Sequence, residues 1–142
     1  MRRVFAGLAT VLVVVVVAQF FLAASGAFDT APNDEAFQPH RSLGYAIVLI
    51  AVLLTVLAAL ARIPGRLIGM TGLIAALAAG QGVIAAIAGA LDGTGGASTT
   101  AGQLVFGLHA VNGLLILALA GTVARRTRAL PVPATGSAQP AR

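Results

Sequence analysis

The stretch VFAGLATVLVVVVVAQFFLAA, residues 4–24, contains one hydroxyl, one amide and no charged side chain. A helix needs about 20 predominantly apolar residues to cross the hydrocarbon core of a bilayer. Three further uncharged runs follow, at residues 43–61, 67–91 and 104–124. Over the whole chain, 58% of the residues are hydrophobic and 9% are charged, which is typical of membrane proteins. The sequence therefore predicts an all-α integral membrane four-helix bundle.

The domain organisation follows from how little sequence lies outside these runs. We predict one four-helix transmembrane domain over residues 1–128 and a disordered cytoplasmic tail over residues 129–142, where proline and small residues replace the apolar runs. The basic start, the apolar run and the small residues at 24–27 also suit a cleaved secretory signal. The first run exceeds the roughly 7–15 apolar residues of such a signal, which favours a retained helix.

The basic residues predict the orientation, because Lys and Arg at the ends of membrane helices stay on the cytoplasmic side. All nine basic residues are arginines, and eight of them precede the first run, connect the second to the third, or follow the fourth. All four acidic residues lie in the other two loops. We expect a multi-pass cell-membrane protein with both termini in the cytoplasm and the lipid bilayer as its partner. The basic charge forms no stripe with interleaved aromatics, which argues against nucleic acid.

A weak internal repeat relates the two halves of the chain. QFFLAASGAFD at residues 19–29 aligns with QGVIAAIAGALD at residues 81–92. The helices that follow open with HRSLGY and HAVNGL, so that His40 corresponds to His109 and Gly44 to Gly113. Because each unit is two helices long and returns to its starting side, we predict parallel helix-pair repeats about an axis along the membrane normal.

The two histidines are candidate ligands for a cofactor. Helix bundles build cofactor sites from side chains on facing helices, and two imidazoles across an axis can supply both axial ligands of a haem iron. Gly44 and Gly113 each lie one turn after a histidine on the same helical face, where they would let a flat macrocycle approach the backbone. The chain has no cysteine, which excludes thiolate ligands and disulfides.

A structural interpretation competes with this one, because a glycine four residues from a polar residue more often marks close helix packing in membranes. Depth also separates the histidines, since His40 lies six positions farther from Arg62 than His109 lies from Arg125. At about 1.5 Å per residue this predicts a mismatch of roughly 9 Å. Helix tilt or a projecting helix end would have to absorb it.

The order of these motifs resembles one four-helix half of haem A synthase: a glutamine near a helix end, HR opening the next helix, a short arginine-bearing turn, QGVIAAIAGAL and LHAVNGLLILALA. It is also similar to small uncharacterised four-helix membrane proteins of actinobacteria. The resemblance covers most of residues 15–122. It implies that His40 and His109 are the metal ligands, binding haem iron as an axial pair, and that Arg41 is the arginine following the first ligand.

Two departures from the synthase limit what the resemblance implies about chemistry. The catalytic half of the synthase carries a glutamate three residues before its histidine, where this chain has Phe37. The synthase also uses two halves, and this chain supplies one. We therefore expect haem b bound for electron transfer or haem handling rather than an enzyme that oxidises haem. The alternative is a cofactor-free membrane scaffold or a subunit of a larger complex.

Several polar residues surround these candidates. Gln19, Gln81, Gln103 and Asn112 are candidate second-layer partners, and we expect Gln19 and Gln81 to form interhelical hydrogen bonds. Arg41 suits either a haem propionate or the acids Asp34 and Glu35 of its own loop. A weaker alternative is a quinone or other lipophile site formed by His109, Asn112 and Tyr45. The glycines between residues 65 and 82 predict tight packing within the bundle or against a second copy in a homodimer.

Overall fold

The computed structural model describes residues 1–93 and 97–129. Its helices are α1 (Arg2–Ala27), α2 (Asn33–Ala36), α3 (Gln38–Leu60), α4 (Gly65–Ala90) and α5 (Thr100–Arg128). The four long helices confirm the predicted all-α fold, and their ends lie within five residues of the ends of the predicted runs. The short helix α2 was not predicted. Apart from residue 129, the predicted cytoplasmic tail lies outside the described residues.

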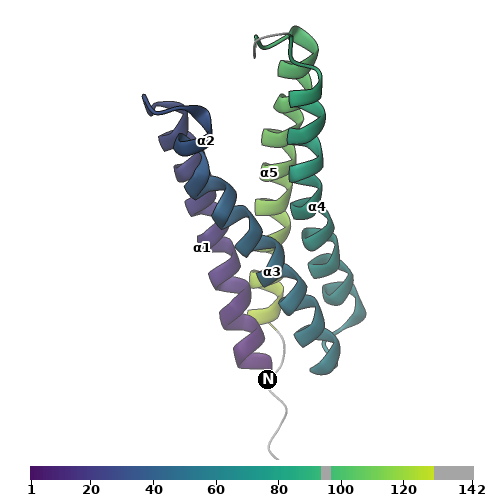
Figure 1. The fold of residues 1–142 in the computed structure, drawn as a ribbon. Helices are drawn as coiled ribbons and strands as arrows, with labels where there is room; N and C mark the ends of the chain where they lie inside the picture. The colour runs from purple at the N-terminus through teal and green to yellow at the C-terminus, as the bar shows by residue number, and fades with distance from the viewer. Residues whose placement is uncertain (94–96, 130–142) are drawn as a thin grey trace, which may run out of the picture.

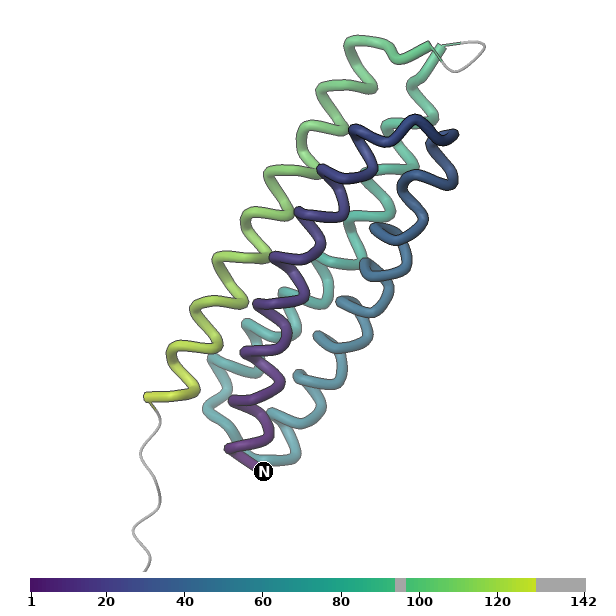
Figure 2. The backbone as a smooth tube through the Cα atoms, turned by 90° about the vertical axis from the view of Figure 1, so that its left-hand side faces the viewer, coloured from purple at the N-terminus to yellow at the C-terminus, as the bar shows by residue number. Residues whose placement is uncertain are grey.

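The four long helices form one bundle in which consecutive helices are antiparallel (Figures 1 and 2). Helix α1 packs against α3 and α5, and α4 packs against the same two helices. Helices α3 and α5 therefore lie diagonally across the bundle. Figure 1 shows the α1/α3 pair and the α4/α5 pair diverging toward the end that carries α2, which we call the outer end. The opposite, inner end holds the N-terminus and the α3–α4 turn.

Local sequence signals explain several helix ends. Thr99 caps α5, because its Oγ1 accepts a hydrogen bond from the backbone N–H of Gly102 at 3.0 Å. Pro64 precedes the first residue of α4, and Pro39 lies in the first turn of α3, where its missing N–H costs no helical hydrogen bond. At the outer end, a Cβ on Gly26 would lie 2.8 Å from the backbone oxygen of Ala36. Only glycine permits α2 to fold this closely onto α1.

The hydrophobic core lies in the inner part of the bundle. In each long helix four buried residues follow the spacing i, i+4, i+7, i+11, which places them on one face. They are Phe5, Ala9, Leu12 and Val16 in α1, Ile47, Ala51, Leu54 and Ala58 in α3, Leu67, Thr71, Ile74 and Ala78 in α4, and Ile116, Ala120, Val123 and Thr127 in α5. Each of the four positions in α1 lies the same number of residues before its counterpart in α4. The same holds for α3 and α5, with a different separation along the chain.

The outward surface of the bundle is apolar. Large hydrophobic side chains such as Val14, Leu49, Val52 and Leu114 are about half exposed or more. Only about a fifth of the most apolar 18-residue window of each long helix is buried, and all four helices are long and apolar enough to cross a membrane. A soluble protein rarely exposes continuous apolar surface of this extent. The architecture is that of a small multi-pass membrane protein.

The glycines of α4 do not show the tight packing within the bundle that their spacing predicted. Only Gly72 has a neighbour, the Thr55 Cγ2 atom, 3.7 Å from an added Cβ. Gly65, Gly69, Gly80 and Gly82 would meet nothing within 4 Å. Their predicted packing against a second copy of the chain stays a prediction.

The turn between α3 and α4 contains a residue in the left-handed region, Arg62, with φ of 52°. Left-handed backbone costs an L-residue roughly 1–2 kcal/mol, more than the roughly 0.5–1 kcal/mol of extra chain entropy that glycine loses on folding. We therefore expect Arg62→Gly to raise the free energy of unfolding in detergent by about 0.5–1 kcal/mol. Arg66→Gly, which removes the same charge from the first turn of helical backbone, is the control and should not stabilise. An equal or lower stability of Arg62→Gly would contradict this account.

Candidate histidine site

The two histidines meet across the bundle. His40 lies in the first turn of α3 and His109 in the third turn of α5. Their ring centroids are 6.1 Å apart and the ring planes are inclined by 45°. Both rings are half-buried, and they lie on the outer side of the core, where the two helix pairs begin to diverge. The chain has no other histidine.

The expectation that the histidines differ in depth is wrong, because Arg125 does not mark the end of its helix. Helix α5 continues to Arg128, whereas α3 ends at Leu60, before Arg62. His40 therefore lies about as far from the end of α3 at Leu60 as His109 lies from the end of α5 at Arg128. The two histidines have almost the same depth without any projecting helix end.

Two hydrogen bonds join His40 to Gln19 on α1. The side-chain Nε2 of Gln19 donates to the backbone oxygen of His40 at 2.8 Å. In return, the His40 Nδ1 lies 3.2 Å from the backbone oxygen of Gln19. The Gln19 Nε2 also lies 3.4 Å from the His40 Nε2. We call this reciprocal contact the Gln–His clasp.

The same clasp joins His109 to Gln81 on α4. The Gln81 Nε2 donates to the backbone oxygen of His109 at 3.1 Å, and the His109 Nδ1 lies 3.3 Å from the backbone oxygen of Gln81. The predicted interhelical hydrogen bonds of Gln19 and Gln81 are therefore confirmed. Within each clasp the glutamine Oε1 is buried, and these two oxygens are the unpartnered buried side-chain polar atoms among the described residues. A buried acceptor without a donor costs roughly 1–3 kcal/mol.

The glycines that follow the histidines adjoin the clasps. A Cβ at Gly44 would lie 3.3 Å from the Gln19 Nε2, and a Cβ at Gly113 would lie 3.4 Å from the Gln81 Nε2 and 3.3 Å from the Phe20 ring. The absent side chains thus make room for a glutamine amide at each site. Their expected role in admitting a macrocycle stays a prediction.

Sequence reasoning missed an aromatic partner for each histidine. Phe37 meets His40 edge to face with ring centroids 6.2 Å apart, and Phe106 stacks on His109 at 5.3 Å with the planes inclined by 7°. Each phenylalanine stands three residues before its histidine. The signal was present in the sequence, because the offset that relates His40 to His109 also relates Phe37 to Phe106.

Arg41 pairs with its own loop. Its Nη1 lies 3.7 Å from the Asp34 Oδ1, and its Nη2 donates to the Asp34 backbone oxygen. Both side chains are exposed, so that this ion pair contributes little to stability. A role of Arg41 in binding a propionate stays a prediction.

The remaining polar candidates have other surroundings. Asn112 donates to the backbone oxygen of Leu77 at 2.9 Å, which joins α5 to α4. Gln103 donates to the Ser98 Oγ at 2.9 Å. Tyr45 is 76% exposed. The residues considered for a lipophile site with His109 are therefore engaged elsewhere or face outward.

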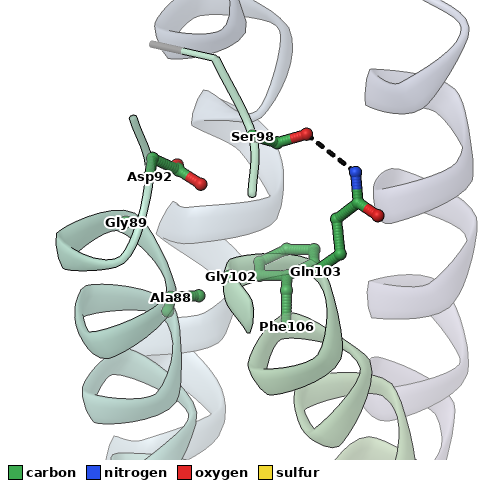
Figure 3. A pocket seen from close by; sticks show the side chains of 8 residues that line it. Ala88, Gly89, Asp92, Ser98, Gly102, Gln103 and Phe106 are labelled. Carbon is green, nitrogen blue, oxygen red and sulfur yellow. Dashed lines mark hydrogen bonds between the residues drawn. The ribbon is translucent and has the colours of Figure 1, made fainter. Parts of the chain in front are cut away.

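A shallow open pocket of about 260 Å³ lies between the outer ends of α4 and α5 (Figure 3). It is lined by Ala85, Ala88, Gly89, Asp92, Ser98, Gly102, Gln103 and Phe106. Asp92 is the one ionisable group of this lining, so the pocket offers little chemistry of its own. Its wall residue Phe106 is the one that stacks on His109.

The geometry of the histidine pair suits a metal held between two imidazoles. The two rings are neighbours, with centroids 6.1 Å apart, and the His40 Nε2 lies 3.4 Å from the Gln19 Nε2, a contact that a metal at that atom would have to replace. Metal-bound histidines usually donate the proton of their other nitrogen to a backbone carbonyl or carboxylate. The backbone oxygens of Gln19 and Gln81 occupy that role beside the two Nδ1 atoms. The donor set therefore fits bis-histidine ligation once the contact of Gln19 with the His40 Nε2 is released.

Comparison with protein families gives a match over the first part of the bundle. The model of a family of unknown function, DUF6220, matches residues 19–89, which is half of the chain. The matched segment begins at Gln19 and contains His40, Gly44 and Gln81, and it ends before His109. No curated protein and no solved structure matches the chain.

Proposed function

The chain belongs to the DUF6220 family of unknown function, and we propose from its own residues that it binds haem b through His40 and His109. The observation that carries the proposal is the pairing of two half-buried imidazoles from diagonal helices, 6.1 Å apart, each with its Nδ1 beside a backbone oxygen. The resemblance to one half of haem A synthase supports the same ligand pair.

A macrocycle bound to this pair would lie where the two helix pairs begin to diverge (Figure 1). The regularly spaced core residues of the four long helices all lie on the inner side of the histidines. On the outer side, Gly26 contacts Ala36 and Phe37, and Gly102 contacts Ala88 and Asp92, so that these close contacts are made within a helix pair and not between the pairs. A flat ligand would displace few of the packing contacts that hold the core.

When bound, haem b would supply one-electron redox chemistry. Held by both His40 and His109, haem b would serve electron transfer or haem handling rather than activation of oxygen. Arg41 would exchange its exposed contact with Asp34 for a propionate, a bidentate interaction that suits its planar guanidinium. Gly44 and Gly113 leave room for the glutamine amides beside the histidines, and these amides would keep the two ligands in place.

The architecture around the site is part of the proposal. The two helix pairs are parallel repeats of one unit, which the constant offsets between matching core, Gln, His and Gly positions support. Both termini are cytoplasmic, since the arginine-rich ends of α1 and α5 and the α3–α4 turn lie together at the inner end. Alkaline phosphatase fused after residue 142 should be inactive, and phosphatase inserted after Asp29 should be active; the reverse pattern contradicts this orientation.

Titration of the purified, cofactor-free protein with haemin tests the proposed function. We expect the Soret difference spectrum to saturate at one haem per chain, because one pair of axial ligands is available. Absorbance that rises linearly without saturation, as for haem partitioning into detergent, would contradict it. In that case we would interpret the protein as a cofactor-free scaffold. A specific contact supports this alternative, because the Gln19 Nε2 lies 3.4 Å from the His40 Nε2, the atom that would bind iron.

A further inference from the structure

We propose that Gln19 and Gln81 are positioning residues that hold His40 and His109 in the tautomer protonated at Nδ1. Both Nε2 atoms then carry a lone pair before any cofactor arrives, and the one at His40 accepts the contact from the Gln19 Nε2. The tautomer itself is a property of the cofactor-free protein. Only the use of the Nε2 atoms as ligands rests on the function proposed above.

Two contacts select the same tautomer at His40. Its Nδ1 faces the backbone oxygen of Gln19 at 3.2 Å, and a carbonyl oxygen can only accept a hydrogen bond. Its Nε2 faces the amide nitrogen of Gln19 at 3.4 Å, and an amide nitrogen can only donate. A proton on Nδ1 satisfies both contacts. A proton on Nε2 would set two donors against each other and two acceptors against each other.

The orientation of the Gln19 amide is fixed independently of the ring. Its Nε2 donates to the backbone oxygen of His40 at 2.8 Å, so that rotating the amide by half a turn would place Oε1 against that oxygen. The amide nitrogen must therefore point at His40. This orientation explains why the buried Oε1 is left without a donor.

The second clasp repeats the two hydrogen bonds with the backbone at His109, and there the Nδ1 contact is the one that selects the tautomer. The Nδ1 faces the backbone oxygen of Gln81 at 3.3 Å, and the Gln81 Nε2 donates to the backbone oxygen of His109 at 3.1 Å. Phe106, stacked parallel on the imidazole, limits rotation of the ring away from this contact. Gly113 leaves the space in which the Gln81 amide lies.

The experiment exploits the fact that the chain has only two histidines. The full-length, cofactor-free protein is labelled with ¹⁵N-histidine in detergent micelles, and the ring nitrogens are assigned with His40→Ala and His109→Ala. At alkaline pH, where imidazoles are neutral, we expect both rings to show a protonated Nδ1 and an unprotonated Nε2. Gln19→Leu should lower the Nδ1-protonated fraction of His40 about twofold or more and leave His109 unchanged. Gln81→Leu should do the reverse, and the control Gln103→Leu should change neither ring.

Protonation at Nε2 of either ring in the wild type would overturn the proposal, and this measurement needs no variant to fold. Unchanged tautomers in both glutamine variants would overturn the role of the side chains. The haemin titration separates the two claims. A colourless protein with both rings protonated at Nδ1 upholds the clasp and refutes haem binding, whereas saturable haem binding with Nε2-protonated rings in the cofactor-free protein does the opposite.

Discussion

We expect His40→Ala and His109→Ala each to weaken haem binding by more than about 100-fold, which exceeds the roughly 10–100-fold effect of removing an outer partner of a ligand. Each substitution removes one of the two proposed ligands, and the sequence contains no third histidine and no cysteine to replace it. Any residual haem should be high-spin or be lost during purification. The measurement is haem content per chain and the spin-state bands of the visible spectrum. The two variants should behave alike, because the two histidines have equivalent positions.

Val56→Ala is the matched control for these variants, since Val56 is half exposed on the outward face of α3 and lies near the opposite end of that helix from His40. It should retain full haem content. Helicity measured by circular dichroism confirms that the histidine variants are folded. A folded variant that lacks either histidine and keeps a stoichiometric low-spin haem would exclude that histidine as a ligand.

Gly44→Leu and Gly113→Leu have the second-largest expected effect. Even a Cβ at these positions would lie 3.3–3.4 Å from a glutamine amide, so that a leucine side chain must displace the clasp. Overpacking of this kind costs roughly 1–3 kcal/mol, and the displaced histidine should lose its fixed orientation. We expect a lower free energy of unfolding in detergent together with loss of haem.

Gly107→Leu is the control, because Gly107 lies on α5 two residues before His109 and an added Cβ there would meet nothing within 4 Å. It should leave both stability and haem content near those of the wild type. If Gly113→Leu and Gly107→Leu were indistinguishable, the close approach at Gly113 would not matter for the site.

Much of the fold could be predicted from the sequence, because a long uncharged run has few alternatives to a membrane helix. The four helices followed from residues 4–24 and their three counterparts. The helix ends were less accurate. Helix α5 includes Arg125 and Arg128, whose charges had suggested that the helix was already over. That misplaced end produced the false depth mismatch between the histidines.

The sequence predicted that His40 and His109 are paired, but it did not predict the contacts that surround them. Extending the alignment of His40 with His109 by three residues would have found Phe37 and Phe106. The role of the glycines could not be read from spacing, since a glycine one turn from a histidine admits a macrocycle or a neighbouring side chain equally well. Which one it admits depends on the facing helix, and in this structure Gln19 and Gln81 lie there.

The visible spectrum of the wild-type protein, purified in mild detergent from haem-supplemented cells and reduced with dithionite, tests the central claim most directly. Two histidine ligands predict the sharp reduced bands of a six-coordinate, low-spin haem b at one haem per chain. A fully helical protein without a Soret band would contradict haem binding by His40 and His109.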